Sequence, residues 1–314
     1  MNATVQARLV ADFTSEVEAD DPYVSYGFGL GGEILVAIRQ SREDPAVESP
    51  GFASFPKSRL DAGGDYRLLV QRPGQPLIRI QVRDEQIPCS YLQPVPDGVL
   101  LVGARCSWPQ SEPEPEKNAV VFDHSSREGR RFCLGDGIQD VRVDPGGSIW
   151  VSYFDEGIFG NYGWGESGRP PLGVAGVAKF DASGNRLDGY DAEAAGTEAI
   201  CDAYAINLAA ADDLWVYFYT DFPIVRWHQR AYRRWAFGQG GATAFAVRGD
   251  RIALFGRDHS LRILALEPDG QTRLVREARV TMDAHPAGPG TLACGVGEVL
   301  YLVGDRRVFA LTEW

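Results

Sequence analysis

The sequence has little cysteine and shows no paired arrangement of it. Its five cysteines are an odd number, lie far apart and include no Cys-x-x-Cys pair. Such a set argues against a disulfide framework and gives no support to a zinc-binding motif. We therefore expect reduced thiols, most of them buried.

Long apolar runs and an excess of basic charge are also missing. No stretch approaches the roughly 18 apolar residues of a membrane-spanning helix, and residues 1–21 lack the basic and apolar regions of a secretory signal. The 43 acidic residues outnumber the 31 basic ones and give a net charge of −12. That charge repels nucleic acid and anionic membrane surfaces. We expect a cytoplasmic protein with no nucleic-acid partner and no membrane partner.

Several common catalytic motifs are absent. The sequence contains no Gly-x-Ser-x-Gly, His-Glu-x-x-His or Walker pattern. Residues 27–32, which are mostly glycine, match the spacing of a dinucleotide-binding loop, but that chemistry requires a helix directly afterwards. Residues 33–38 have the character of a strand instead. The glycines therefore predict a hairpin turn.

The sequence does contain a degenerate repeat. Six short runs, rich in branched and aromatic residues and bounded by turn residues, each predict a strand that is buried on both faces. Their mean spacing is close to the roughly 40 to 50 residues of a propeller blade. The runs are residues 34–38, 99–103, 149–153, 214–218, 252–256 and 299–303.

Each run predicts the second strand of a four-stranded blade, whose strands we call A to D. Only three strands, residues 292–296, 299–303 and 307–311, remain for the last blade. Near the N-terminus, alternating apolar residues from Val5 to Phe13 predict a strand with one buried face. We therefore predict one domain over residues 1–314, an all-β, six-bladed β-propeller whose last blade is closed by the N-terminal strand.

The predicted connections between strands differ greatly in length. Because antiparallel strands reverse direction at each turn, the A-to-B and C-to-D turns share one face, and the B-to-C and D-to-A connections share the other. Long loops on a rigid scaffold commonly carry function, so we predict a pocket at the long-loop mouth of the central channel. All the long loops belong to the second face: residues 41–65, 106–118, 154–173, 191–202 and 281–290.

The loop of residues 154–173 has the composition of a ligand site. Tyr162, Trp164 and Glu166 are its predicted ligand-binding residues, and the glycines among them let a ligand approach the backbone closely. Asp155 and Glu156, which lie just after a B strand, are predicted catalytic residues.

Two histidines fall on the long-loop side of the last two predicted blades. His259 and His285 form a candidate acid–base pair, because histidine transfers protons most readily near neutral pH. Two unrelated surface histidines are the alternative interpretation.

Two carboxylates are candidate metal ligands. Asp140 enters strand A of the third blade and Asp202 enters strand A of the fourth. Convergent oxygen atoms there could hold Ca²⁺ or Mg²⁺. A channel-lining hydrogen-bond network without a metal ion is the alternative.

The segment from Asp144 to Val151, DPGGSIWV, and the segment from Phe180 to Asn185, FDASGN, resemble elements of six-bladed propellers. The families concerned are the calcium-dependent gluconolactonase and strictosidine-synthase-like group and the NHL-repeat proteins. In the gluconolactonase group, acidic residues and Asn from several blades hold the metal at the channel mouth. The resemblance therefore implies that role for Asp140 and Asp202.

Two classes of function remain open. The first is a small-molecule-binding or enzymatic propeller, with a divalent-metal-assisted, lactonase-like hydrolase or a lyase among the reactions considered. The second is a non-catalytic scaffold that binds a protein or peptide on the same face. A deep pocket would favour the first class and a broad flat groove the second. We favour a small-molecule ligand, while the residues do not decide whether the protein is an enzyme.

Overall fold

The computed structural model describes residues 3–21, 23–40, 46–47, 55–166 and 168–314. These residues form strands almost throughout, with two short helices, α1 (Asp155–Phe159) and α2 (Ala192–Ala195). Within these ranges, no helix has the length and apolar character needed to cross a membrane. The chain divides into two compact units: unit 1 contains the N-terminal residues to Glu18 together with Asp191–Trp314, and unit 2 contains Ala19–Tyr190. Each unit is described by itself.

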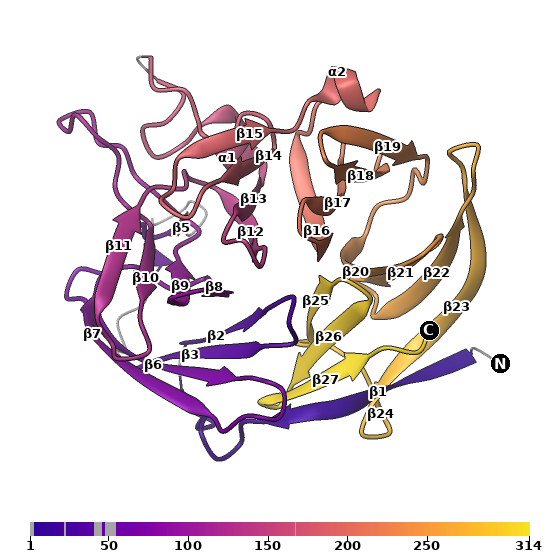
Figure 1. Cartoon of the computed structure of the whole chain (residues 1–314), viewed down its shortest axis with the longest axis horizontal. Helices are drawn as coiled ribbons and strands as arrows, with labels where there is room; N and C mark the ends of the chain where they lie inside the picture. The colour runs from indigo at the N-terminus through magenta and orange to yellow at the C-terminus, as the bar shows by residue number, and fades with distance from the viewer. Residues whose placement is uncertain (1–2, 22, 41–45, 48–54, 167) are drawn as a thin grey trace. The chain divides into compact units, whose positions relative to one another are not determined.

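The described residues of unit 2 form three four-stranded antiparallel sheets, each built from consecutive strands (Figure 1). The first strands of neighbouring sheets contact one another, β2 against β8 and β8 against β12. A short pair, β4 (Ala46–Val47) and β5 (Phe55–Pro56), lies between β3 and β6 in the chain. The three sheets are β2 (Tyr23–Phe28), β3 (Ile34–Arg39), β6 (Gly64–Gln71) and β7 (Ile78–Glu85); β8 (Tyr91–Val95), β9 (Gly98–Val102), β10 (Ala119–Phe122) and β11 (Glu128–Phe132); and β12 (Ile138–Val143), β13 (Ile149–Tyr153), β14 (Val177–Phe180) and β15 (Arg186–Gly189).

The described part of unit 1 repeats this plan. Strands β16 to β19 form one four-stranded sheet, and β20 to β23 follow one another within a nine-stranded sheet. Strand β1 pairs in parallel with β23 and antiparallel with β27, which joins the last strands into one larger sheet. The strands are β1 (Ala3–Asp12), β16 (Asp202–Ala210), β17 (Asp213–Tyr219), β18 (Ile224–His228), β19 (Ala231–Trp235), β20 (Ala242–Arg248), β21 (Arg251–Gly256), β22 (Ser260–Leu266), β23 (Thr272–Met282), β24 (His285–Pro286), β25 (Leu292–Val296), β26 (Val299–Gly304) and β27 (Arg307–Leu311).

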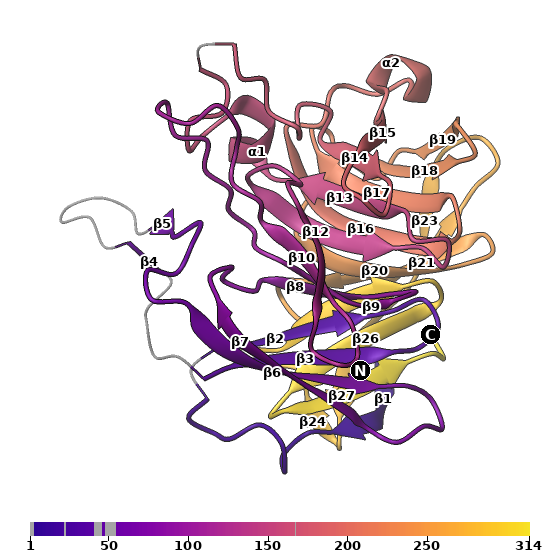
Figure 2. The same cartoon turned by 60° about the vertical axis from the view of Figure 1, so that its left-hand side comes forward.

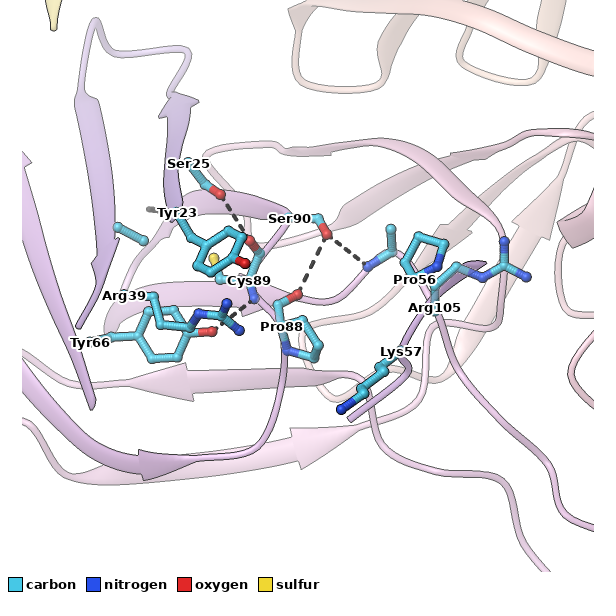
Figure 3. A pocket seen from close by; sticks show the side chains of 12 residues that line it. Tyr23, Ser25, Arg39, Pro56, Lys57, Tyr66, Pro88, Cys89, Ser90 and Arg105 are labelled. Carbon is cyan, nitrogen blue, oxygen red and sulfur yellow. Dashed lines mark hydrogen bonds between the residues drawn. The ribbon is translucent and has the colours of Figure 1, made fainter. Parts of the chain in front are cut away.

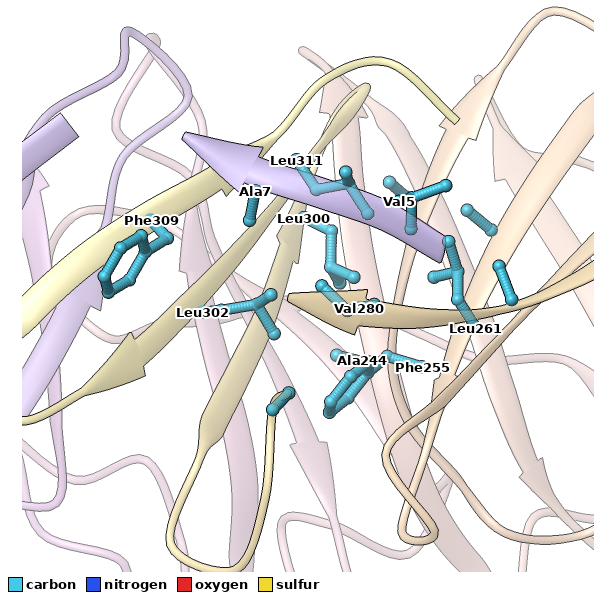
Figure 4. Close-up of a cluster of buried hydrophobic side chains, with 14 of the residues drawn as sticks. Val5, Ala7, Ala244, Phe255, Leu261, Val280, Leu300, Leu302, Phe309 and Leu311 are labelled. Carbon is cyan, nitrogen blue, oxygen red and sulfur yellow. The ribbon is translucent and has the colours of Figure 1, made fainter. Parts of the chain in front are cut away.

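The N-terminal strand β1 is held by one face of alternating side chains. Val5 and Ala7 are buried, whereas the residues beside and between them are more exposed. Figure 4 shows both side chains packed in a cluster that also contains Leu300 and Leu311 of the last blade and Val280 of β23. One apolar cluster therefore joins β1 to the strands on both of its sides. The predicted closure of the last blade by the N-terminal strand is confirmed.

Glycine lets the first strands of neighbouring sheets approach each other without a side chain between them. In unit 2, a Cβ atom added to Gly27 of β2 would lie 2.1 Å from the carbonyl oxygen of Leu92 on β8. In unit 1, a Cβ atom on Gly295 of β25 would lie 1.6 Å from the carbonyl oxygen of Phe245 on β20. Because both distances are far inside van der Waals contact, only glycine fits at these positions.

Buried asparagines bind backbone groups where the sheets meet. In unit 1 the Asn207 amide of β16 donates to the carbonyl oxygens of Phe245, at 2.7 Å, and Gly297, at 3.0 Å. Its oxygen accepts the Gly297 amide at 2.8 Å. Asn118 of unit 2 likewise donates to two carbonyl oxygens, both at 2.9 Å. A fully bonded buried polar group fixes the arrangement of the strands around it.

The unequal lengths of the connections are confirmed within unit 2. Residues 144–148 join β12 to β13, whereas residues 103–118 join β9 to β10 and residues 154–176 join β13 to β14. Figure 2 shows the last of these connections, which carries α1, at the left end of β13. In the predicted loop 41–65, residues 41–45 and 48–54 lie outside the described residues.

The four-stranded sheets confirm the predicted all-β fold class of the β-propeller type. Strand β13 has the predicted bounds, and the glycines before β3 form the predicted hairpin turn, with Gly29 donating to the Glu33 carbonyl oxygen at 2.9 Å. The count of six blades and the single domain stay predictions.

Substituting Gly295 by alanine tests the close approach of the strands in unit 1. We expect Gly295→Ala to lower the free energy of unfolding by about 3 kcal/mol, because the added methyl group overlaps the Phe245 carbonyl group. Gly288→Ala is the matched control: its nearest heavy atom lies 4.0 Å away, so the expected change is within about 0.5 kcal/mol. Urea denaturation measures both, and equal stabilities of the two variants would contradict the packing role of Gly295.

Candidate functional site

A cavity of about 150 Å³ lies at the long-connection end of the first two sheets of unit 2 (Figure 3). A volume of about 150 Å³ is enough for a compound the size of benzene. The lining residues come from β2, β3, β5 and β6 and from the chain that follows β5, β7 and β9. They are Tyr23, Ser25, Ala37, Arg39, Pro56, Lys57, Tyr66, Pro88, Cys89, Ser90, Ala104 and Arg105.

Positive charge is concentrated around this cavity. Three of its described lining side chains, Arg39, Lys57 and Arg105, are cationic, and none of those lining side chains is acidic. Arg39 and Arg105 are only 2% and 4% exposed. The guanidinium of Arg105 is already bound by Asp136 and Glu156, so a negatively charged occupant would be bound by Arg39 and Lys57.

Arg39 is positioned by the strand that it ends. Every residue of β3 is buried, so packing along the strand fixes the stem of Arg39. Its Cζ atom lies 3.8 Å from the centroid of the Tyr23 ring, and Figure 3 shows the guanidinium beside the rings of Tyr23 and Tyr66. Stacking on an aromatic ring fixes the plane of a guanidinium, and a guanidinium can bind both oxygens of a carboxylate or phosphate.

One wall of the cavity is held rigid by side-chain hydrogen bonds to the backbone. The Tyr66 hydroxyl donates to the Ile87 carbonyl oxygen at 2.8 Å and accepts the Cys89 amide at 3.2 Å. The Ser25 hydroxyl donates to the Cys89 carbonyl oxygen at 2.8 Å. Burial raises the pKa of both Tyr66 and Cys89 above their ordinary values, so both stay neutral at pH 7. They therefore add polar groups to the wall without adding negative charge.

Arg105 follows β9 and is the centre of a charged cluster. Its Nε and Nη2 atoms donate to the two oxygens of Asp136 at 3.0 and 2.8 Å, and its Nη1 atom donates to Glu156. Its Cζ atom also lies 4.2 Å from the centroid of the Tyr162 ring. Such a two-point ion pair with an aromatic cover fixes the orientation of a guanidinium.

The carboxylate of Asp136 depends on Arg105. Asp136 is 3% exposed, and burial raises its pKa, while the charge of Arg105 and the Cys106 amide at 2.8 Å act in the opposite direction. A carboxyl group with a raised pKa favours the folded state below its ordinary pKa and loses that contribution as the pH rises through the raised value. At neutral pH, Arg105 therefore limits the cost of the buried negative charge.

The structure brings together two of the residues predicted in loop 154–173. Glu156 and Tyr162 both contact the guanidinium of Arg105. The loop thus reaches the cavity through Arg105, and none of the described lining residues belongs to residues 154–173.

The other predicted residues of this loop have different surroundings. Trp164 is 3% exposed, donates to the Cys106 carbonyl oxygen at 2.8 Å and therefore anchors the loop. Asp155 is exposed, and its carboxylate accepts the neighbouring amide of Glu156 at 2.8 Å. Glu166 accepts a long contact of 3.5 Å from Gln110. The ligand-binding and catalytic roles of these residues stay predictions.

The predicted metal ligands Asp140 and Asp202 belong to different units, so their convergence stays a prediction. In unit 2 the Asp140 carboxylate forms an ion pair with Arg142 and accepts the Val141 amide at 2.8 Å. Asp202 is the first residue of β16 in unit 1. Across the described ranges, no group of three or more His, Cys, Asp or Glu side chains could hold a metal ion. Because Ca²⁺ takes six to eight oxygen ligands, the described donors do not by themselves fit such an ion.

The predicted histidines both lie in unit 1. His259 occupies the turn between β21 and β22 with a φ of 60° and lines a groove of about 370 Å³ together with Asp258, Ser260 and Pro286. His285, in β24, is exposed and is not among the described residues that line this groove. Their role as an acid–base pair stays a prediction.

The sequence analysis did not single out Arg39 and Arg105, although the sequence contains a signal for them. Each follows a run of apolar B-strand residues, as Ile-Leu-Val-Ala-Ile-Arg at Arg39 and Leu-Leu-Val-Gly-Ala-Arg at Arg105. A cation directly after a buried strand is costly unless other groups bind it. Arg39 directly follows the run 34–38, and Arg105 lies two residues after the run 99–103.

Replacing Arg105 with methionine tests its role in the charged cluster. We expect Arg105→Met to destabilise the protein at pH 7 by about 3–5 kcal/mol, because it leaves Asp136 buried without its partner. This loss of stability should become smaller as the pH falls, because protonation removes the uncompensated charge of Asp136. Arg83→Met, at a side chain 79% exposed, is the control, with an expected loss below about 1 kcal/mol. Chemical denaturation across pH measures both, and a deficit that grows toward acid pH would contradict this account.

No protein-family model matches the chain, and no curated protein matches it. A solved structure, the crystal structure of a mitotic checkpoint complex, is similar over 98% of this chain and 91% of the compared chain, with 10% sequence identity and a TM-score of 0.49. The assignment to the β-propeller class rests on the four-stranded sheets of the two units.

Proposed function

We propose that this protein binds a small anionic compound in the cavity between the first two sheets of unit 2. The observation that carries this proposal is the set of three cationic side chains, two of them almost fully buried, around a cavity whose described lining has no acidic side chain. An anionic ligand would form charge-assisted hydrogen bonds with Arg39 and Lys57, whereas Arg105 is already bound by Asp136 and Glu156. This proposal belongs to the small-molecule-binding class of function rather than to the scaffold class.

The size and donor geometry of the cavity narrow the ligand to a small carboxylate or phosphate. A volume of about 150 Å³ is well below the roughly 300–1,000 Å³ of sites for drug-sized ligands. The planar guanidinium of Arg39 suits two-point binding of an oxyanion, and Lys57 supplies a second, more adaptable charge. The side chain of Lys57 is 22% exposed and binds Asp61 at 2.7 Å, so it can exchange that surface carboxylate for a ligand.

The chemistry of the cavity supports binding more than catalysis. Burial raises the pKa of two lining side chains, Tyr66 and Cys89, above their ordinary values. A catalytic group needs a pKa near the operating pH, or activation by a neighbouring base. No comparable observation supports the lactonase-like hydrolase, the lyase or the protein-binding scaffold.

Thermal denaturation with matched anions tests the proposal. We expect acetate or inorganic phosphate to raise the melting temperature, while the uncharged analogue acetamide, at the same concentration and ionic strength, leaves it unchanged. A ligand at 100 times its dissociation constant stabilises a protein by about 2.7 kcal/mol. Arg39→Met should abolish the shift, because it removes the two-point contact.

Two further variants make this test decisive. Lys57→Met should reduce the anion-dependent rise in melting temperature several-fold. Because Lys57 is partly exposed, this variant does not replace a fully buried side chain as Arg39→Met does. The exposed control Arg83→Met should keep the full shift. Stabilisation that acetamide reproduces, or that Arg39→Met and Lys57→Met both retain, would rule out this cavity as the binding site.

A further inference from the structure

Two cysteines of unit 2 lie in contact beside the charged cluster. The Sγ atoms of Cys106 and Cys133 are 3.6 Å apart, and both thiols are free. Cys106 is fully buried in the connection after β9, and Cys133 directly follows β11 and is partly exposed. A disulfide bond has a length of about 2.05 Å, so a closing movement of about 1.5 Å would join them. Both residues lie in connections rather than in strands, where such a movement is least restricted.

The two thiols have different surroundings. The Cys106 thiol donates to the Glu116 carbonyl oxygen at 3.2 Å and contacts the Cys133 sulfur. The Cys133 sulfur also accepts the Gly135 amide at 3.3 Å. The contact with Cys106 and the Gly135 amide lower the pKa of Cys133, whereas the contact with Cys133 and burial raise the pKa of Cys106. Cys133 is therefore the better nucleophile, and Cys106 is held beside it as the second thiol.

We propose that Cys133 and Cys106 form a reversible disulfide when the protein reacts with a peroxide. The Cys133 thiolate attacks one oxygen of hydrogen peroxide, the O–O bond breaks, and the products after protonation are the Cys133 sulfenic acid and water. The Cys106 sulfur then attacks the sulfenic sulfur, forms the S–S bond and releases the second water. In total, two thiols lose two hydrogens and one peroxide becomes two waters. A dithiol reductant reverses the bond by exchange.

This disulfide would act on the same cluster that holds Arg105. Cys106 is the neighbour of Arg105 in the chain, and its amide binds the Asp136 carboxylate at 2.8 Å. Cys133 lies three residues before Asp136. The bond would therefore tie together the two connections that supply the ion pair at one end of the cavity. The proposal goes beyond the proposed anion binding and does not depend on it.

The test is oxidation of the full chain with stoichiometric hydrogen peroxide, followed by non-reducing peptide mapping. We expect two of the five thiols to disappear, one peptide pair to join Cys106 to Cys133 with a loss of two hydrogens, and dithiothreitol to restore both thiols. At pH 7, iodoacetamide should label Cys133 at least about tenfold faster than Cys89, whose pKa is raised by burial.

Serine variants provide the controls. Cys133→Ser and Cys106→Ser should each prevent the disulfide, and Cys106→Ser should leave Cys133 to accumulate as higher acids under excess peroxide. Cys201→Ser, a partly exposed cysteine of unit 1, should leave the disulfide unchanged. Peptide mapping of the oxidised protein without substitutions tests the proposal even where a variant fails to fold. Five intact thiols after oxidation, or a disulfide between other cysteines, would overturn the proposal.

Discussion

The close approach of the first strands of neighbouring sheets is the constraint on which each unit depends. At Gly27 and Gly295, backbone meets backbone with no room for a side chain, and in unit 1 Asn207 adds hydrogen bonds to the backbone of Phe245 and Gly297. Because the first strands of neighbouring sheets lie so close together, the later strands of those sheets must lie farther apart. The later strands then pack through apolar side chains, as the cluster around Val5 does in unit 1.

The same constraint explains why the candidate site lies at the ends of strands. The B strands are buried along their length, so they have no room for polar chemistry until they end. Arg39 and Arg105 are placed where the chain leaves this packing, and each is still nearly buried. A guanidinium in that position must be bound, and the aromatic rings, carboxylates and cavity around the two arginines are the consequence.

Long connections supply Lys57 and Arg105 to this site, and the loop of residues 154–173 supports it. Glu156 and Tyr162 orient Arg105, and Trp164 fixes their loop through a hydrogen bond to the connection after β9. Arg39 lies on a strand, and Arg105 is held by a surrounding layer of contacts, so both keep their geometry better than groups on a free loop. The pair formed by Cys106 and Cys133 belongs to this supporting layer. A bond between the two would therefore act on the surroundings of Arg105.

The sequence by itself determined the strands, their grouping into four-stranded sheets and the closing role of Val5 and Ala7, because apolar periodicity and turn residues are local signals. It also identified loop 154–173, whose Glu156 and Tyr162 do meet a charged group. It could not identify the cavity, because that depends on which ends of separate strands come together. Only the tertiary structure decided that Arg39 and Arg105 line one cavity, that Trp164 is an anchor and that Cys106 lies 3.6 Å from Cys133. These are contacts between residues far apart in the chain, and no local pattern encodes them.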